Sequence, residues 1–200
     1  FVLMSDHLES LFRCLTGGDD DVAEKAVQDI VAISALQPVE VLQGVDVLLN
    51  NPLADHRWWA LRIVAEISGE QTLSRLMAGL RDPEAAVRQC AALGLRKHPY
   101  EKSLTILIET LSDADRLVAQ LARDALIAMG KDATLALVDT LQNGSQIARL
   151  EAVRALAMIG DERAIPALFN ALDSESRWIE YWASLGLERM GVGMSFFLPE

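Results

Sequence analysis

The sequence contains few cysteines, few aromatic residues and no long apolar run. Its two cysteines, Cys14 and Cys90, lie far apart within helical patterns, which excludes a disulfide framework and a thiolate zinc site. Both are expected to fill space as small apolar side chains. The apolar runs are a few residues long, whereas a membrane span needs about 20. The apolar start at residues 1–4 meets Asp6 too soon for a secretory signal, so a cytoplasmic protein is expected.

Basic side chains are also scarce. The chain has 18 Lys and Arg against 29 Asp and Glu, a net charge of −11. This balance repels polyphosphate unless a basic stripe is segregated on one face, so no nucleic-acid partner is expected. The composition, 51% apolar but only 6% aromatic, favours a helical protein, and 200 residues suffice for a sizeable core. Met4 resembles a natural start, which would make residues 1–3 an addition.

A sequence template recurs six times. Its clearest copies start with an aliphatic residue or Ala, and then have Ala four positions later, Leu eight later, Met or Ile eleven later and Gly twelve later. The copies that start at residues 118, 148 and 179 are the clearest, and those at 22, 56 and 87 are looser. The apolar positions fall within about 100° of arc on a helix, which predicts one buried stripe per copy. The predicted inner helices span residues 22–34, 56–68, 87–98, 118–130, 148–160 and 179–191.

A shorter apolar-periodic stretch precedes each copy and predicts an outer helix, with a polar turn between the two. A hairpin of about 30 residues cannot cover its own apolar stripe, so neighbouring hairpins must stack and share one core. The predicted fold is therefore an all-α, right-handed α-solenoid of six stacked helical hairpins, with the inner helices on the concave side. It is expected to form one domain over residues 1–191. An apolar tail at 192–200 follows, which either caps the last repeat or offers a docking or dimerisation surface.

Two segments resemble the HEAT-like repeats of the phycobilisome lyase type. They are the run from Leu80 to Arg88, with Asp82 and then Val87 before the arginine, and the run Ile159–Leu168. The resemblance implies a ladder in which the turn Asp pairs with the Arg after the Val. Applied to this sequence, it implies pairs of Asp82 with Arg88, of Asn51 or Asp55 with Arg57, and of Asn143 with Arg149. Because many unrelated proteins use this repeat, the resemblance indicates a fold rather than a function.

The most outward position of the inner helices carries two unexpected aromatic residues, Trp58 and Tyr181. An exposed aromatic ring contributes little to folding, whereas rings of this kind form the hot spots of protein interfaces. We interpret both as anchors for a partner; the alternative is that they pack on the next repeat. One position further round, Trp59 and Trp182 either fill space between repeats or contact a ligand.

Several arginines lie near these rings. Arg62 and Arg154 are candidates for charges that orient a partner. A local basic patch is either a solvated face or an anion site, and it comprises Arg57, Arg62, Arg88, Arg96 and Lys97.

No catalytic motif, metal cluster or cofactor loop is recognisable, so no catalytic, metal or cofactor-binding residue is predicted and an enzyme is not expected. His56 and His98 lie at opposite ends of adjacent helices and do not form a metal pair. The leading hypothesis is a non-catalytic scaffold that binds a protein or peptide on its concave surface, through Trp58, Arg62, Arg154, Tyr181 and Trp182. The alternative is a bilin lyase subunit or related chaperone in which Trp and Tyr stack on a tetrapyrrole. A HEAT-like DNA glycosylase is disfavoured by the acidic charge.

Overall fold

The computed structural model describes residues 6–192, and these form α-helices and short 3₁₀-helices without any β-strand. The chain divides into two compact units, Phe1–His98 and Pro99–Glu200. Each unit holds three helical hairpins, each made of a first helix, predicted as outer, and a second helix, predicted as inner. The prediction of an all-α fold built from six helical hairpins is confirmed. Within residues 6–192, no helix is both long and apolar enough to cross a bilayer.

The hairpins of the first unit pair α1 with α2, α3 with α4 and α5 with α6. The second helices contact one another in order, α2 with α4 and α4 with α6. The six helices are α1 (Asp6–Cys14), α2 (Asp20–Ser34), α3 (Pro38–Leu49), α4 (Ala54–Val64), α5 (Glu70–Gly79) and α6 (Ala85–Lys97).

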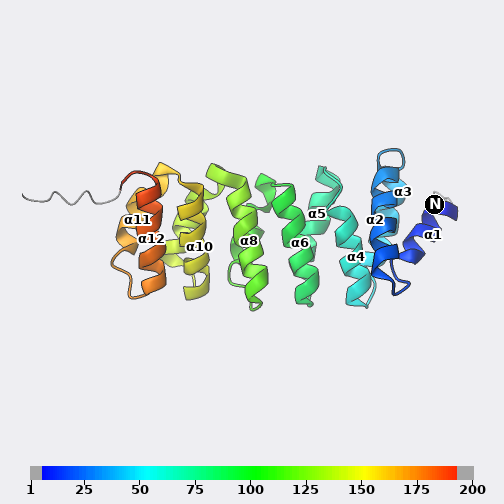
Figure 1. The fold of residues 1–200 in the computed structure, drawn as a ribbon, viewed down its shortest axis with the longest axis horizontal. Helices are drawn as coiled ribbons and strands as arrows, with labels where there is room; N and C mark the ends of the chain where they lie inside the picture. Colours follow the sequence, from blue (N-terminus) through cyan, green and yellow to red (C-terminus); the bar gives the residue numbers. More distant parts are fainter. Residues whose placement is uncertain (1–5, 193–200) are drawn as a thin grey trace, which may run out of the picture. The chain divides into compact units, whose positions relative to one another are not determined.

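The second unit repeats this plan, with a short 3₁₀-helix before each first helix. Figure 1 shows its second helices α8, α10 and α12 side by side in one layer, with α11 in the layer behind. The elements are η1 (Glu101–Ser103), α7 (Leu104–Thr110), α8 (Arg116–Met129), η2 (Gly130–Ala133), α9 (Thr134–Asn143), α10 (Gln146–Ile159), η3 (Glu162–Ala164), α11 (Ile165–Ala171) and α12 (Arg177–Arg189).

Each second helix begins two residues before its template copy, because the template starts inside the first turn of the helix and not at its cap. Asp19, Asp115 and Ser145 cap α2, α8 and α10 by accepting hydrogen bonds from the backbone N–H three residues later. Helix α4 ends at Val64, short of the predicted residue 68. The chain turns there through Gly69, whose φ of +144° an L side chain rarely adopts.

The glycine at the last position of the template ends the helix in the three clearest copies. Gly130, Gly160 and Gly191 follow α8, α10 and α12, and their φ angles are 63°, 66° and 74°. The Gly160 N–H donates to the Leu156 carbonyl, which satisfies one of the free carbonyls at the end of α10.

The cores of the two units are built from the same two template positions, one with a small side chain and one with a large side chain. The Ala four positions into every copy is buried, as is the Leu eight positions in where present. The six alanines are Ala26, Ala60, Ala91, Ala122, Ala152 and Ala183. These small side chains let neighbouring second helices approach closely, and the leucines fill the space between the two layers.

Glycine replaces alanine at contacts where the helices approach even more closely. A Cβ on Gly94 of α6 would lie 2.6 Å from Leu76 Cδ2 and 3.1 Å from Ala65 Cβ. A Cβ on Gly186 of α12 would lie 3.1 Å from both Cα and Cβ of Ala157 in α10. Both glycines therefore mark contacts that no larger residue fits without movement.

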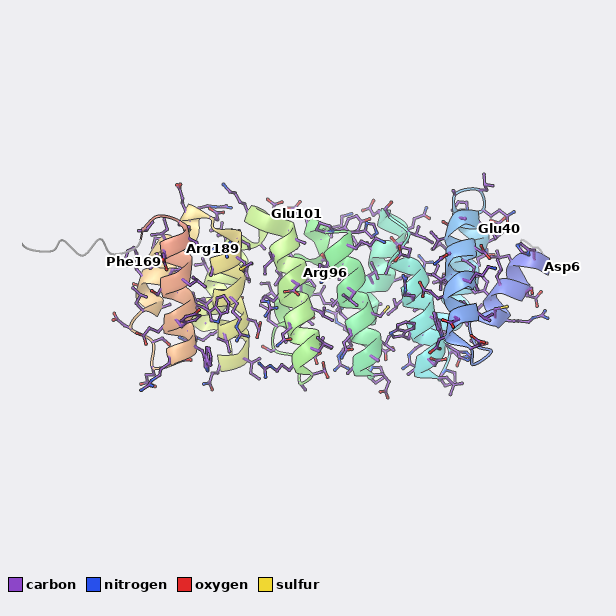
Figure 2. All side chains as sticks on the ribbon, viewed as in Figure 1. Asp6, Glu40, Arg96, Glu101, Phe169 and Arg189 are labelled. Carbon is purple, nitrogen blue, oxygen red and sulfur yellow. The ribbon has the colours of Figure 1, made fainter. Side chains whose placement is uncertain are left out.

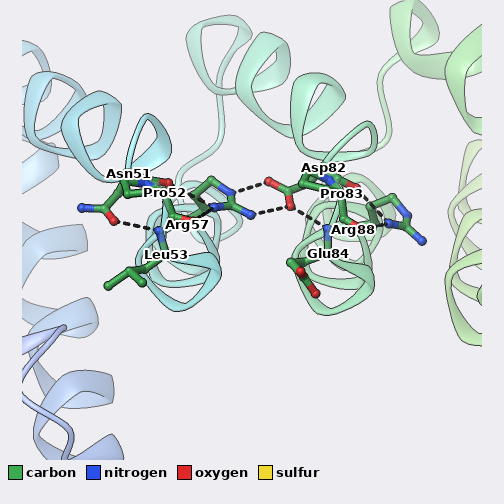
Figure 3. A network of polar contacts seen from close by, with 8 residues as sticks. All are labelled: Asn51, Pro52, Leu53, Arg57, Asp82, Pro83, Glu84 and Arg88. Atoms are coloured by element: carbon green, nitrogen blue, oxygen red, sulfur yellow. Dashed lines mark hydrogen bonds and ion pairs between the residues drawn. The ribbon is translucent and has the colours of Figure 1, made fainter.

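Two turns of the first unit are closed in the same way (Figure 3). The side chains of Asn51 and Asp82 each accept a hydrogen bond from the backbone N–H two residues later, at 2.9 Å in both turns. Six positions after each turn residue, an arginine donates through Nη1 to two carbonyl oxygens of the same turn. Arg57 does so for the first turn and Arg88 for the second.

Arg57 also joins two hairpins. Its Nε and Nη2 donate to the carboxylate oxygens of Asp82 at 2.7 and 2.9 Å, in a bidentate ion pair between side chains only 13% and 9% exposed. The predicted contact of Asp82 with Arg88 is made through the Asp82 backbone carbonyl, while the carboxylate binds the preceding hairpin. The reason is that Arg88, which lies in the same hairpin as Asp82, donates to the backbone carbonyl oxygens of the turn.

The ladder is interrupted where the arginine is absent. Ala23 takes the arginine's position in the first hairpin, and the next turn carries the uncharged Asn51; likewise Ala119 is followed by Asn143. The predicted pair of Asn143 with Arg149 is wrong. Arg149 Nε donates instead to a backbone carbonyl eight residues earlier, and Asn143 donates to an acid on its own helix.

The variant Asp82→Asn tests the ladder. The amide still closes its own turn but no longer balances the Arg57 charge, so the free energy of unfolding near neutral pH should fall by about 1–3 kcal/mol. Burial acts to raise the pKa of the Asp82 carboxyl, but hydrogen bonds led by Arg57 outweigh it and hold that pKa below its ordinary value. The advantage of the wild type is therefore complete above the unfolded carboxyl pKa of about 3.9 and is lost as the pH falls through the lower folded value. Urea titrations across this range should show the difference shrinking, whereas the exposed control Asp29→Asn should match the wild type throughout. A difference independent of pH would contradict the ion-pair assignment.

Gly94→Val tests the close approach of α6 to α4 and α5. Two methyl groups beyond a Cβ that already meets its neighbours should cost about 2 kcal/mol or more through overpacking. Ala128→Val, at an exposed site of α8, controls for the lower helix propensity of valine and should cost about 0.5 kcal/mol. Thermal and urea unfolding followed by circular dichroism measure both, and equal losses would show that α6 has room to adjust.

Candidate functional site

The outward position predicted on the second helices is the fifth residue of each helix. The six residues there are Glu24, Trp58, Gln89, Gln120, Leu150 and Tyr181. Tyr181 is 55% exposed, as expected for an anchor. Trp58 is only half-buried rather than fully exposed, because its ring rests on a neighbouring residue.

That neighbour is Trp59. The two rings meet edge to face, with centroids 4.8 Å apart and planes at 87°. Trp59 is 6% exposed and lies in the core, in agreement with the expectation that it fills space between hairpins. The buried ring thus holds the half-exposed ring of Trp58 in place on the surface of α4.

Two hollows flank Trp58 on the face formed by α2, α4 and α6. The first has a volume of about 550 Å³ and lies at the N-terminal ends of these helices. The second has a volume of about 540 Å³ and lies further along α4 and α6, where Arg96 is labelled in Figure 2. Carboxylates of Asp20, Glu24 and Asp55 line the first hollow, and no basic side chain does. Basic residues reach the second hollow instead.

The predicted orienting charge Arg62 lines the second hollow but is bound to two acids. It donates to Glu24 on α2 and, at 2.6 Å, to Glu66 just beyond α4. Lys97 pairs with the same Glu66, and these hydrogen bonds, led by that from Lys97, lower the pKa of the Glu66 carboxyl. Much of the predicted basic patch is therefore neutralised by acids of the first unit. Cys90, in the wall of this hollow, is buried, and burial raises the pKa of its thiol to about 12, which keeps it protonated.

The second unit carries an aromatic cluster on α12. Trp178 and Tyr181 are 63% and 55% exposed, and their centroids are 6.4 Å apart, edge to face. Tyr181 meets Trp182 in the same way at 5.6 Å. Trp182 is half-buried, and the guanidinium of Arg154 on α10 lies 5.6 Å from its ring centroid. The structure therefore brings three predicted residues together, Arg154, Tyr181 and Trp182, with Trp178 beside them on the same side of α12.

Arg154 is held by a buried acid that the sequence did not single out. Glu151, only 3% exposed, accepts from Arg154 at 2.8 Å and from Arg123 of α8 at 2.7 Å. Arg123 also pairs with Asp124 at 2.8 Å. This network ties α8 to α10 and positions Arg154 against Trp182. Like Arg62, Arg154 thus serves first to join neighbouring second helices.

A second exposed row was missed by sequence reasoning. It is the second residue of each second helix, three positions before the predicted outward one and on the same side. In the second unit this row is apolar and consists of Leu117, Ile147 and Trp178, which are 48%, 55% and 63% exposed. We call it the apolar row. The equivalent residues of the first unit are Asp21, Asp55 and Ala86. Extending the template by one residue toward the N-terminus would have found it.

Other candidates do not assemble into a site. Within residues 6–192, no three His, Cys, Asp or Glu side chains are grouped so that they could hold a metal ion. The Nδ1 of His56 and the Nε2 of His98 are buried without a hydrogen-bond partner in the described part of the chain. Residues 193–200 of the tail, predicted as a cap or docking surface, lie outside the described residues.

Comparisons with known proteins agree with this architecture. None of the curated proteins compared with the chain matches it. Among solved structures, an engineered protein is similar over 95% of this chain and 100% of its own, with 23% identity and a TM-score of 0.52. A designed armadillo repeat protein in complex with the peptide (KR)4 is similar over 93% of this chain and 100% of its own, with 18% identity and a TM-score of 0.52. At these identities the likeness concerns the fold.

The family model for HEAT repeats matches residues 43–127 and 132–193, which is more than half of the chain. The match covers part of α3 and all of α4–α6 in the first unit and most of the second unit, while α1 and α2 lie outside it. It confirms the predicted fold class, an α-solenoid of HEAT-like helical hairpins. The repeated hairpins and this match show that the chain belongs to the HEAT repeat family.

Proposed function

We propose that this HEAT-repeat protein is a non-catalytic scaffold that binds a partner protein or peptide on the exposed face of its second helices. The observation that carries the proposal is the aromatic cluster of α12 together with the apolar row. Four large apolar side chains there, Leu117, Ile147, Trp178 and Tyr181, are each about half exposed or more. Isolated exposed apolar residues are ordinary, but a row across three adjacent helices is typical of an interaction surface.

The proposed anchors are Trp178 and Tyr181, supported by Trp182, and Trp58 in the first unit. Aromatic anchors on a rigid surface contribute most to binding because little conformational entropy is lost when they are covered. Edge-to-face contacts with buried or half-buried rings hold Tyr181 and Trp58 in place before any partner arrives. Arg62 and Arg154 present the remaining donors of their guanidinium groups beside these rings. The neighbour of similar fold that holds a peptide agrees with this use of the architecture, but the proposal depends on the side chains of this chain.

The finer parts of the proposal concern location and assembly. A cytoplasmic location is proposed from the scarcity of cysteine, which is typical of proteins in a reducing compartment. Self-association through the last hairpin is the proposed mode of dimerisation, because the exposed aromatic cluster lies on its second helix.

Comparative capture tests the binding surface. The wild type is used to capture partner proteins from a lysate of the source cells, and quantitative mass spectrometry measures the amount of each. The double variant Trp178→Ala, Tyr181→Ala should capture at least about tenfold less of each partner. The matched control is Phe169→Ala, which removes a 42%-exposed aromatic residue from α11, in the other helical layer (Figure 2). Since all three residues are exposed, each variant should unfold within about 0.5 kcal/mol of the wild type. Equal capture by the double variant and the control would refute the choice of anchors.

Phycocyanobilin tests the alternative function, a bilin lyase subunit or related chaperone. That function requires a tetrapyrrole to stack on Trp or Tyr with an arginine at its propionates. The charges of Arg62 and Arg154 are already balanced by Glu24, Glu66 and Glu151, so mixing the protein with the free bilin should leave its visible absorbance and fluorescence unchanged. A red shift or a fluorescence gain that disappears in Trp58→Ala would favour the phycobilisome-related function instead.

A further inference from the structure

The first hollow beside Trp58 combines aromatic and acidic groups with no basic one. The rings of Trp58 and Trp59 and the side chain of Val87 form its apolar wall. The carboxylates of Asp20 and Asp55 lie at its rim, on α2 and α4. A volume of about 550 Å³ is ample for one long side chain and its flanking backbone.

The acids of this hollow differ in how far the fold uses them. Glu24 is bound by Arg62, so its charge is largely balanced. Asp20 and Asp55 form no ion pair or side-chain hydrogen bond within residues 6–192, although they line the same space. Both acids lie in the first turn of their helices, where the N-terminal end of α2 or α4 carries a partial positive charge. This partial positive charge weakens but does not cancel the two full negative charges that remain.

The same face already shows how it binds a guanidinium group. Arg62 spans from α2 to the end of α4 with Glu24 on one side and Glu66 on the other, and Trp58 lines the hollow beside it. The first hollow also has carboxylic acids from two helices beside Trp58, Asp20 of α2 and Asp55 of α4, but no basic side chain lines it.

We infer that the first hollow binds an arginine side chain of an extended, basic partner peptide, stacked on Trp58 and paired with Asp55 and Asp20. The planar guanidinium group suits this site because it stacks on an indole ring and also forks onto carboxylates, whereas a lysine ammonium does only part of this. Charge complementarity points the same way, since the chain carries a net charge of −11. The inference rests on the proposed scaffold function and specifies the partner chemistry of the first unit.

Fluorescence anisotropy with a labelled octapeptide of alternating Arg and Ser tests the inference on the full chain. The control peptide replaces every Arg with citrulline, which has nearly the same shape without the charge. The wild type should bind the Arg peptide and bind the citrulline peptide at least about tenfold more weakly, and added salt should weaken Arg-peptide binding.

Variants then locate the binding. Asp55→Asn should weaken Arg-peptide binding by about threefold, and so should Asp20→Asn, as expected for partly exposed ion pairs. Trp58→Leu should weaken it by about fivefold through the loss of the cation–π contact. The matched control Asp29→Asn removes an exposed charge from α2 outside the hollow and should leave binding unchanged. Circular dichroism verifies that each variant is folded. If Trp58→Leu does not fold, the two Asp→Asn variants still test the inference.

The inference is overturned if the citrulline peptide binds equally well, or if Asp29→Asn weakens binding as much as Asp55→Asn does, which would indicate attraction to the overall charge only. Failure of the scaffold function is separate, because it is measured by capture through Trp178 and Tyr181 in the second unit. Loss of capture in that double variant without any binding of the Arg peptide would retain the scaffold and reject the arginine site.

Discussion

The close packing of one second helix against the next is the constraint on which the rest of the structure depends. A single hairpin exposes its apolar stripe, so each unit is stable only because its hairpins share a core. The buried alanine in every template copy, and glycine at Gly94 and Gly186, keep the helices close enough for that core to be continuous within a unit. As a consequence, only a narrow outward edge of each second helix, chiefly its second and fifth residues, is free of the demands of packing.

Charged groups divide into those that hold hairpins together and those that do not. Arg57, Arg62 and Arg123 each bridge adjacent second helices or the turns before them by binding carboxylates. In a chain with only 18 basic residues against 29 acidic ones, this use of arginine in structural pairs leaves fewer cations to balance the remaining acids. Hence Asp20 and Asp55, which no such pair neutralises in the described part of the chain, carry the charge that a partner would meet.

The repeat itself could be predicted from sequence because it is a local property. The periodic Ala, Leu and Gly positions fixed the helices, their buried faces and stops such as Gly160. Pairings across hairpins could not be predicted in the same way, since the partner of Asp82 depends on how far one hairpin is shifted against the next. Arg62 and Arg154 were likewise expected to face a partner, although Glu24 of the neighbouring helix binds Arg62, and Glu151 of α10, which Arg123 of α8 also binds, holds Arg154. The apolar row was missed because it lies one residue before the start of the template.

The contrast between equivalent rows in the two units argues for function rather than folding. Asp21, Asp55 and Ala86 show that the second residue of these helices tolerates small or charged side chains without loss of the hairpin. Leu117, Ile147 and Trp178 hold the same position, gain little burial from it, and make the surface less soluble. A requirement for folding alone would favour polar residues in both rows. The apolar row is therefore best explained by a contact outside the unit that buries it, while Asp21 and Asp55 of the equivalent row suit a partner of opposite charge.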